Sequence, residues 1–444
     1  MSDELIRPRT LKGFRDLLPD AAMSRESLVA RAVDVYRSYG FSPIETPALE
    51  YAEILLGKGG DETEKQTYRF EDAGGRDVAL RFDLTVPFAR FAAEHAGRLG
   101  TPFKRYHVGT VWRGENTQRG RYREFMQCDF DTIGTESVLA DLETLLVTHD
   151  LFVALGFDRF TIRFSDRRIL GGLLENLGLG DSAVAVLRSL DKLQKTSRAR
   201  VEAELATVPG ADAGKVARII ELAAMSGDAA GILDRVAPLV GGNPTGDAGI
   251  AAVGDVLSGI EAAGVSPGRI VLDLSIARGL DYYTGMVFET YLDDLPGIGS
   301  CCSGGRYDDL ASLYTKDRLP GVGGSLGVDR LLAAMDELGL SGQRSTWADV
   351  LVTVFDDEGA VGAVEIATTL RRGGVATEVY PEARKLGAQL KYANGKGHRL
   401  AVIAGPSERD RGQVQVKVLA SGEAVDVTLE DLVATCRRLL AAHG

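Results

Sequence analysis

The chain has 444 residues, of which 45% are hydrophobic and 26% charged, which is typical of a folded protein of roughly three domains. Acidic residues outnumber basic ones by 63 to 51, so the net charge of −12 argues against a general nucleic-acid coat but allows local basic patches. No run reaches the ~20 apolar residues that span a bilayer, and the charged N-terminus lacks the apolar centre of a signal peptide, so we expect a cytoplasmic protein with no membrane partner.

The first part of the chain predicts a helix followed by strands. Apolar residues at helical spacing fill 25–39, with Ser24 as the expected N-cap and Gly40 closing the helix. An extended piece punctuated by prolines follows, and residues 76–83 and 104–131 show the alternation of strands. We interpret the second of these stretches as a long hairpin.

Helical segments then interrupt the strands. The Ala/Leu-rich stretch from about 166 to 268 is interpreted as a helical insertion, and strands resume over 270–292 and near residue 300. A polar stretch at 339–347 is interpreted as a linker. Beyond it strands and helices alternate, which is typical of a mainly parallel sheet covered on both faces.

One face of the predicted strand that starts at Arg121 carries an unusual combination of side chains. Six residues alternate onto this face: Arg121, Arg123, Phe125, Gln127, Asp129 and Asp131. Arginine binds phosphate in a planar fork and an aromatic ring can stack on a base, while Gln127 and Asp131 could hold a small polar ligand. Two interpretations remain open from these residues alone, namely a site for a nucleotide with a second ligand, or a solvent-facing sheet surface with cross-strand ion pairs.

Residues 276–290 form a predicted hairpin between two buried strands, and their composition does not suit a simple turn. The segment carries Arg278, Tyr282 and Tyr283, although turns have no local need for a guanidinium and two phenols. These three side chains, with Asp281 between them, are therefore candidates for a functional site. The alternative, left open by these residues alone, is a turn that carries surface side chains.

Two weaker candidates lie elsewhere in the chain. Asp83 and Thr85 end a strand where a side chain can project into a cleft. The Gly-rich turn predicted at 321–327 leads into a helix that carries Arg330, and helix N-termini attract phosphate, although the spacing is not that of a P-loop or a dinucleotide fingerprint.

Cysteines and histidines form no metal-binding motif in the sequence. The four cysteines and five histidines are scattered, and no two cysteines have C-x-x-C spacing. We therefore expect no structural or catalytic metal site.

Taken together, these motifs resemble those of the class II aminoacyl-tRNA synthetases. The strand with Arg113, its loop and "RYREF" resemble motif two, 321–335 resembles motif three, and the helix at 25–39 with the extended piece to Pro47 resembles motif one, which builds the dimer interface in that class. "RGLDYYTG" and "SGGRYDDL" (303–310) resemble two peptides peculiar to the histidyl members. "VYPEARKLGAQLKYANGKG" is similar to their anticodon-binding domain.

The resemblance implies a fold and an activity. The expected fold is an α+β catalytic domain over 1–340, built on a mainly antiparallel sheet with the insertion at 166–268, and a separate anticodon-binding α/β domain with a mixed sheet over 348–444. The implied activity is that of a homodimeric histidine–tRNA ligase, with histidine, tRNA(His) and ATP as substrates and Mg²⁺ carried with the ATP. The alternative is a non-catalytic paralogue that binds histidine and regulates another enzyme.

The resemblance also assigns roles to individual residues. Arg113 and Arg278 would stabilise charge at the ATP α-phosphate and the histidine carboxylate during catalysis. The other ATP-binding residues would be Glu115, Arg121, Phe125 and Arg330. Histidine would be bound through its ammonium group by Asp83, Thr85 and Gln127, and through its imidazole by Asp131, Tyr282 and Tyr283. The tRNA would meet five basic residues, Arg384, Lys385, Lys391, Lys396 and Arg399.

Overall fold

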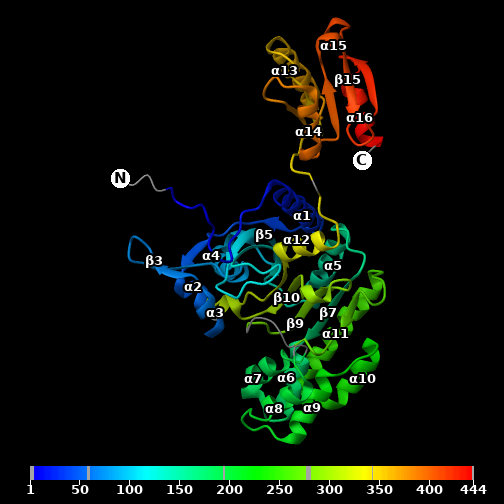
Figure 1. The fold of residues 1–444 in the computed structure, drawn as a ribbon. Coiled ribbons are helices and arrows are strands. Elements are labelled where there is room, and N and C mark those ends of the chain that lie inside the picture. The colour runs from blue at the N-terminus through cyan, green and yellow to red at the C-terminus, as the bar shows by residue number, and fades with distance from the viewer. Residues whose placement is uncertain (1–4, 58–60, 194–195, 277–281, 343, 443–444) are drawn as a thin grey trace. The chain divides into compact units, whose positions relative to one another are not determined.

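The computed structural model describes residues 5–57, 61–193, 196–276, 282–342 and 344–442. They form two compact units, Met1–Arg15 with Ser27–Gly339 and Asp16–Glu26 with Leu340–Gly444, which are traced in Figure 1. Among the described residues, no helix combines the length and the apolar character needed to cross a membrane.

An eight-stranded sheet forms the centre of the first unit. Its strands, in spatial order, are β1 (Ser42–Pro43), β5 (Phe103–Trp112), β6 (Glu124–Ile133), β11 (Gly321–Gly327), β10 (Cys302–Tyr307), β9 (Met286–Leu292), β7 (Phe160–Asp166) and β8 (Ile270–Leu272). Only the two edge pairs, β1 with β5 and β7 with β8, are parallel. The predicted mainly antiparallel sheet is therefore confirmed.

One face of this sheet packs against long helices. The helices that share its hydrophobic core include α1 (Pro19–Ser38), α5 (Val138–Ala154), α11 (Pro244–Ala262) and α12 (Val328–Glu337). Tyr36 of α1, for example, lies with its ring centroid 5.0 Å from that of Phe130 on β6. The predicted start of α1 was wrong, because the helix already begins at Pro19, whose fixed φ suits a first helical turn, so Ser24 lies inside it.

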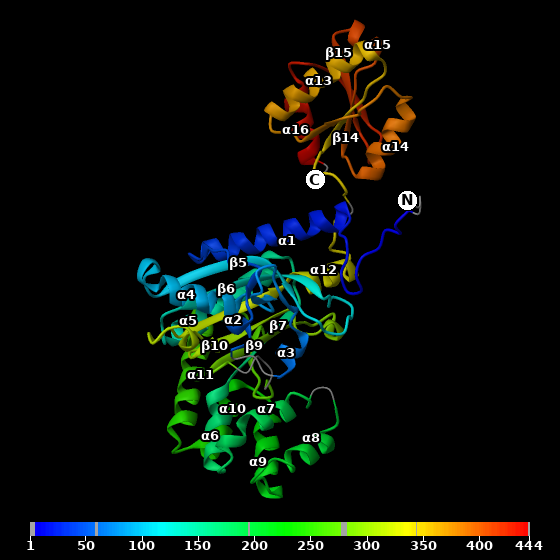
Figure 2. The same cartoon turned by 90° about the vertical axis from the view of Figure 1, so that its left-hand side faces the viewer.

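The predicted insertion is a cluster of helices between β7 and β8, all of them short except α11. Its members are α6 (Arg167–Asn176), η1 (Gly180–Ser182), α7 (Ala183–Leu190), α8 (Arg198–Leu205), α9 (Ala213–Ala223), α10 (Ala229–Val240) and α11. Figure 2 shows α6 to α10 gathered beside the sheet rather than over it. Asp212, Asp228 and Asn243 accept backbone N–H groups at the starts of α9, α10 and α11, which is how such residues begin helices.

A three-stranded sheet and several short helices complete the first unit. The sheet has the order β2 (Leu49–Tyr51), β4 (Asp77–Leu80) and β3 (Arg69–Glu71). The helices are α2 (Ala52–Leu56), α3 (Asp61–Gln66), α4 (Thr85–Leu99), η2 (Pro296–Ile298) and η3 (Leu310–Leu313). β4 ends earlier than predicted, because the chain turns at Asp83 to begin α4.

Two further predictions in the first unit were wrong. β8 and β9 do not form a hairpin, because β7 lies between them and pairs with both. The Gly-rich stretch at 321–327 is a central strand, β11, rather than a turn. A Cβ at Gly323 would lie 2.3 Å from a carboxylate oxygen of Asp131, and one at Gly324 would lie 2.8 Å from the Phe288 ring, so β11 fits between its neighbours only without side chains there.

The second unit is a five-stranded mixed sheet with helices. Its strand order is β13 (Thr377–Val379), β12 (Val350–Val352), β14 (Leu400–Ile403), β15 (Gln413–Val418) and β16 (Ala424–Thr428). Its helices beyond the linker are α13 (Asp357–Arg372), α14 (Leu386–Lys396), α15 (Pro406–Asp410) and α16 (Leu432–Ala442). The mixed sheet is confirmed. The prediction of a mainly parallel sheet was wrong, because β15 is antiparallel to both its neighbours, and a short connection turns it back into β16.

Candidate active site

A cavity of about 210 Å³ lies in the first unit and gathers side chains from distant parts of the sequence. Among the predicted site residues, those that line it are Asp83, Thr85, Arg113, Phe125, Gln127, Tyr282, Tyr283 and Arg330. They come from the start of α4, the end of β5, β6, the segment before β9, and α12. The predicted set therefore meets at one site, with the exceptions described below.

Asp83 both starts α4 and contributes a carboxylate to the cavity. Its Oδ1 accepts the backbone N–H groups of Thr85 at 3.1 Å and of Val86 at 3.0 Å. Only 5% of the residue is exposed, and burial raises the pKa of this carboxyl above its ordinary value. The helix start therefore holds a buried acceptor in a fixed orientation at the cavity wall.

Arg113 is held between two aromatic rings just beyond the end of β5. Its guanidinium carbon lies 4.3 Å from the centroid of the Phe82 ring and 5.1 Å from that of Phe125, and its Nε donates to the Phe82 carbonyl at 3.0 Å. Such contacts with ring faces favour a cation and restrict its motion. Burial lowers the pKa of Arg113, but an arginine remains charged at any physiological pH.

The loop after Arg113 and the start of α12 lie against each other. Gly120 has a φ of +70° and a Cβ there would lie 3.2 Å from the Cα of Arg330, so the close approach favours glycine. Arg330 donates to the carbonyl of Ser300. Glu115 and Arg121 do not line the cavity, although their side chains form an ion pair at 3.5 Å.

The start of the second hairpin strand was predicted too early. β6 begins at Glu124, and Arg121 forms only an isolated bridge with Gln118. The face that continues along β6 is buried, since the exposed fractions of Gln127, Asp129 and Asp131 are 7%, 1% and 2%. The alternative of a solvent-facing surface is therefore wrong for this part of the strand.

Gln127 is positioned by a neighbouring strand. Its Nε2 donates to the Oγ of Ser325 on β11 at 2.5 Å, while its Oε1 has no hydrogen-bond partner among the described residues. A buried polar atom without a partner costs free energy. The amide oxygen is thus available to a donor from a ligand in the cavity.

Asp131 lies behind the cavity wall rather than in it. Tyr307 donates its hydroxyl to Oδ1 of Asp131 at 2.5 Å, and Nη2 of the fully buried Arg105 lies 2.7 Å from Oδ2. Burial raises the pKa of Asp131, with the Arg105 charge opposing that rise. The structure therefore places Asp131 next to the predicted ligand site but not on its surface.

The cross-strand pair beside Asp131 and Arg105 consists of His107 and Asp129. Burial and the positive charges of Arg105 and Arg81 lower the pKa of His107 to about 3, so this ring is neutral. Burial raises the pKa of Asp129 to about 7, although Arg105 opposes the rise. The layer beneath the cavity is thus unusually rich in buried ionisable groups.

Tyr282 and Tyr283 both reach the cavity from the segment before β9. Their ring centroids are 5.0 Å apart, and that of Tyr282 is 6.0 Å from the Tyr307 ring. Burial raises the pKa of both phenols, which stay neutral at physiological pH. Arg278 and Asp281, which precede them in the chain, lie outside the described residues.

The structure adds cavity residues that the sequence did not single out, among them Glu289, Ser303 and Ser325. They lie directly opposite one another on β9, β10 and β11, so they form one row across the cavity floor. Glu289 could have been found from the alternation of Val287, Glu289 and Tyr291, because a carboxylate inside an apolar strand is unusual.

The five basic residues predicted to bind tRNA lie in the second unit and are held differently. Arg384, Lys385 and Lys391 are exposed, and Arg384 pairs with Glu382 at 2.9 Å. The Nζ atom of Lys396 lies 5.5 Å from the centroid of the Tyr392 ring on α14. Arg399 is more enclosed, since it donates to a carbonyl near the end of α16.

Comparisons with known proteins agree with this site. The family model described as histidyl-tRNA synthetase matches residues 13–331, and that of an anticodon binding domain matches 349–439. The chain belongs to the histidyl-tRNA synthetase family. A histidine–tRNA ligase of Rhodopirellula baltica is 57% identical over 95% of this chain and 96% of the relative, and one of Wolinella succinogenes is 45% identical over 94% and 95%. The crystal structure of the histidyl-tRNA synthetase of Nostoc sp. has a TM-score of 0.89 at 33% identity, covering 98% of this chain and 100% of that one.

These relatives of the histidyl-tRNA synthetase family decide between the two activities considered above. They are histidine–tRNA ligases that match nearly the whole chain, including the second unit. The prediction of an aminoacyl-tRNA ligase for histidine is therefore confirmed, and none of these relatives favours the regulatory paralogue.

Proposed function

We propose that the cavity is where the chain joins histidine to ATP before passing it to the 3′ end of tRNA(His). The observation that carries this assignment is the meeting of Asp83, Gln127, Tyr283, Arg113 and Arg330 from separate segments around one cavity. Acidic, amide and phenolic groups suit an amino acid with an imidazole, while two arginines suit phosphates.

The nucleotide occupies the end of the cavity near Arg113, Phe125 and Arg330, together with Glu115 and Arg121 of the adjoining loop; we call this set the nucleotide end. Phe125 offers a ring on which adenine stacks, and Arg330 at the start of α12 receives the outer phosphates. The histidine carboxylate attacks the α-phosphorus and pyrophosphate leaves. Arg113 and Arg278 stabilise the negative charge on the phosphorus oxygens as the new bond forms. Mg²⁺ enters with ATP and offsets the phosphate charge.

Histidine occupies the opposite end, which we call the histidine end and define by Asp83, Thr85, Gln127, Tyr282 and Tyr283. Its ammonium group donates to acceptor atoms of Asp83, Thr85 and Gln127. The hydrogen bonds that fix the orientations of Asp83 and Gln127 support this assignment. The imidazole lies toward the tyrosines, with Asp131 acting from behind them through Tyr307. Because Asp83 and Gln127 are buried, an amino acid that fails to satisfy them leaves costly unpaired polar atoms.

In the second step the terminal ribose hydroxyl of tRNA attacks the carbonyl carbon of the adenylate and AMP leaves. The second unit binds the anticodon, and Arg384, Lys385, Lys391 and Lys396 supply phosphate contacts. We exclude Arg399 from this set, because its guanidinium already binds groups of its own unit, including the carboxylate of Asp349 at 3.8 Å.

The protein acts as a homodimer in the cytoplasm under this proposal. Support for a dimer comes from three apolar side chains on the small sheet, since Leu49, Tyr51 and Phe70 are 39%, 51% and 47% exposed. The helix at 25–39 and the extended chain to Pro47, which adjoin this region in sequence, complete the proposed interface. A symmetric pair would cover them. Sedimentation that finds only the 47.5 kDa monomer at micromolar concentration would contradict the dimer.

The direct test of the activity is exchange of labelled pyrophosphate into ATP by the purified chain. Exchange should require histidine, and the same protein should charge tRNA(His) when tRNA is added. A chain ending near Gly342 should retain exchange if the dimer persists, but should need far more tRNA for charging. Exchange without histidine, or none with it, would refute the assignment.

A further inference from the structure

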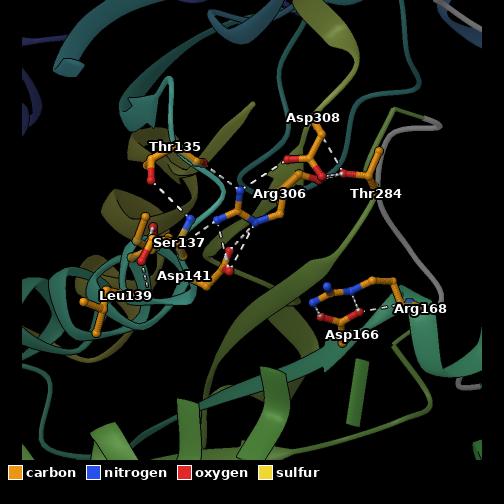
Figure 3. Close-up of polar contacts among 11 residues, drawn as sticks. Thr135, Ser137, Leu139, Asp141, Asp166, Arg168, Thr284, Arg306 and Asp308 are labelled. Carbon is orange, nitrogen blue, oxygen red and sulfur yellow. Dashed lines mark hydrogen bonds and ion pairs between the residues drawn. The ribbon is translucent and has the colours of Figure 1, made fainter. Parts of the chain in front are cut away.

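Arg306 lies at the centre of a buried polar network beside the histidine end, and the reaction described above gives it no role. The residue belongs to β10 and is 4% exposed. Figure 3 shows its guanidinium surrounded by acceptors from separate segments of the chain. A buried arginine is costly unless its donors are satisfied, so this arrangement has a structural or functional cause.

All three nitrogens of the Arg306 guanidinium donate to the protein. Nε donates to Asp141 at 2.9 Å, and Nη2 donates to the same carboxylate at 3.1 Å and to the carbonyl of Ser137 at 3.2 Å. Nη1 donates to the carbonyl of Thr135 at 3.0 Å and to Asp308 at 3.2 Å. These contacts fix the orientation of the planar guanidinium. A lysine ammonium has fewer donors and no planar geometry, so it could not make the same set of hydrogen bonds.

The network continues from Asp308 to the segment that carries the two tyrosines. The hydroxyl of Thr284 donates to Asp308 at 2.9 Å and accepts the backbone N–H of Asp308 at 3.1 Å, as Figure 3 shows. The backbone N–H of Thr284 also donates to the carbonyl of Arg306 at 2.8 Å. Thr284 directly follows Tyr283 in the chain, so this end of the segment is fixed at three points.

Close packing reinforces these hydrogen bonds. A Cβ at Gly285 would lie 3.1 Å from Cδ of Arg306, and one at Gly305 would lie 3.0 Å from the Tyr283 ring. In addition, Nη1 of Arg167 donates to the carbonyl of Tyr283 at 2.9 Å, and the Arg167 guanidinium carbon lies 5.6 Å from the centroid of the Tyr283 ring. The Tyr283 ring is therefore confined between β10 and the start of α6.

We propose that Arg306 is a positioning residue for histidine recognition, which acts through Asp308 and Thr284 to hold Tyr282 and Tyr283 at the cavity wall. The inference rests on the proposed histidine end. Arg306 ties this wall to the loop and the first turn of α5, since Thr135, Ser137 and Asp141 lie there. Misplacing the phenols weakens histidine binding and leaves the nucleotide end intact.

The test compares three substitutions at Thr284 and Asp308 by histidine-dependent pyrophosphate exchange. Thr284→Val keeps the shape but loses the hydroxyl, and should raise the KM for histidine by roughly tenfold, the scale of one hydrogen bond to a charged group, with the KM for ATP unchanged. Asp308→Asn should act in the same direction. Thr284→Ser keeps the hydroxyl and should restore a KM for histidine near that of the wild type.

Thr161→Val is the matched control. The Thr161 hydroxyl donates to Asp293 at 2.9 Å in the same unit, so the substitution breaks the same kind of contact away from the cavity residues, and both KM values should stay unchanged. An unaltered KM for histidine in Thr284→Val, or equal losses for both substrates, would overturn the inference. Equal effects of Thr284→Ser and Thr284→Val would also overturn it.

A separate variant tells this inference apart from the assignment of the histidine end itself. Tyr283→Phe removes only the phenolic hydroxyl and should raise the KM for histidine whether or not Arg306 has a positioning role. If Tyr283→Phe has this effect and Thr284→Val has none, the histidine end stands and the role of Arg306 falls. If Tyr283→Phe has no effect either, the assignment of Tyr283 falls with it.

Discussion

At the histidine end of the cavity the two polar residues Asp83 and Gln127 are buried and bound by their neighbours, whereas at the nucleotide end the polar residues Glu115 and Arg121 are partly exposed. Asp83 and Gln127 are 5% and 7% exposed, and each has a hydrogen-bond partner in the strand or helix beside it. By contrast, the Arg121 side chain is 41% exposed and its contact with Glu115 is long, at 3.5 Å.

This difference matches what the two ligands require. A small amino acid must be told apart from others of similar size, and buried, oriented groups do this because a wrong ligand leaves them unpaired. ATP offers a large charged surface that arginines can bind without such tight enclosure. The histidine end lowers the folding stability, since a layer of buried ionisable groups lies beneath it.

The largest expected effect is at Arg113 of the nucleotide end. Arg113→Ala removes a guanidinium held between Phe82 and Phe125 and should lower the rate of histidyl-adenylate formation by ~10²-fold or more, the scale of one preorganised electrostatic donor. Single-turnover measurement of adenylate formation checks this. A rate near that of the wild type would remove Arg113 from the chemistry.

The second prediction concerns the stability cost of the histidine end. Burial raises the pKa of Asp129 from an ordinary 3.8 to about 7, so between these values the unfolded state releases a proton that the folded state keeps. Stability therefore falls as pH rises through this window. Asp129→Asn should relieve the penalty, by at most about 4 kcal/mol above pH 7 and by nothing below about pH 4.

Urea unfolding of Asp129→Asn and the wild type at pH 5 and pH 8 measures this effect. The variant should unfold at a higher urea midpoint than the wild type, and the increase should be larger at pH 8 than at pH 5. Glu115→Gln at the nucleotide end is the matched control. It should shift the urea midpoint little at either pH, because the ion pair of Glu115 with Arg121 is partly exposed. If the difference in urea midpoint between Asp129→Asn and the wild type is the same at both pH values, the assignment of a buried carboxyl with a raised pKa is contradicted.

The smallest expected effect lies outside the cavity, in the second unit. Lys391→Ala removes an exposed charge and should raise the KM for tRNA about twofold to threefold, reduce the dependence of tRNA binding on salt by roughly one counterion, and leave pyrophosphate exchange unchanged. Charging assays at two salt concentrations test it. A change in exchange would show that Lys391 influences the cavity instead.

Most of the architecture could be predicted because local patterns determine it. The alternation along 104–131 predicted β5 and β6, and the spacing of apolar residues predicted α1 and the insertion helices. Many of the site residues were already candidates from their types and positions, whereas their individual roles came from the resemblance to a family. The structure adds that most of the residues predicted to bind histidine and ATP line one cavity.

What failed depends on contacts between distant segments. No local signal shows that β7 inserts between β8 and β9, because strand order is decided by packing. In the sequence alone, the glycines of β11 are typical of a turn. In the structure they are required because the side chains of Asp131 and Phe288 leave no room for a Cβ. Likewise, Asp131 could be placed on the correct face, but only the structure shows that Arg105 and Tyr307 engage its carboxylate behind the cavity.

The central claim is that the histidine end of the cavity selects the amino acid while the nucleotide end holds ATP. One pair of variants tests it most directly, with the KM for histidine and the KM for ATP both measured by pyrophosphate exchange. Gln127→Ala should raise the KM for histidine by roughly tenfold or more with that for ATP unchanged, while Arg121→Ala should raise the KM for ATP severalfold with that for histidine unchanged. If both variants raise both values alike, or if the pattern is reversed, the division of the cavity into two ends is wrong.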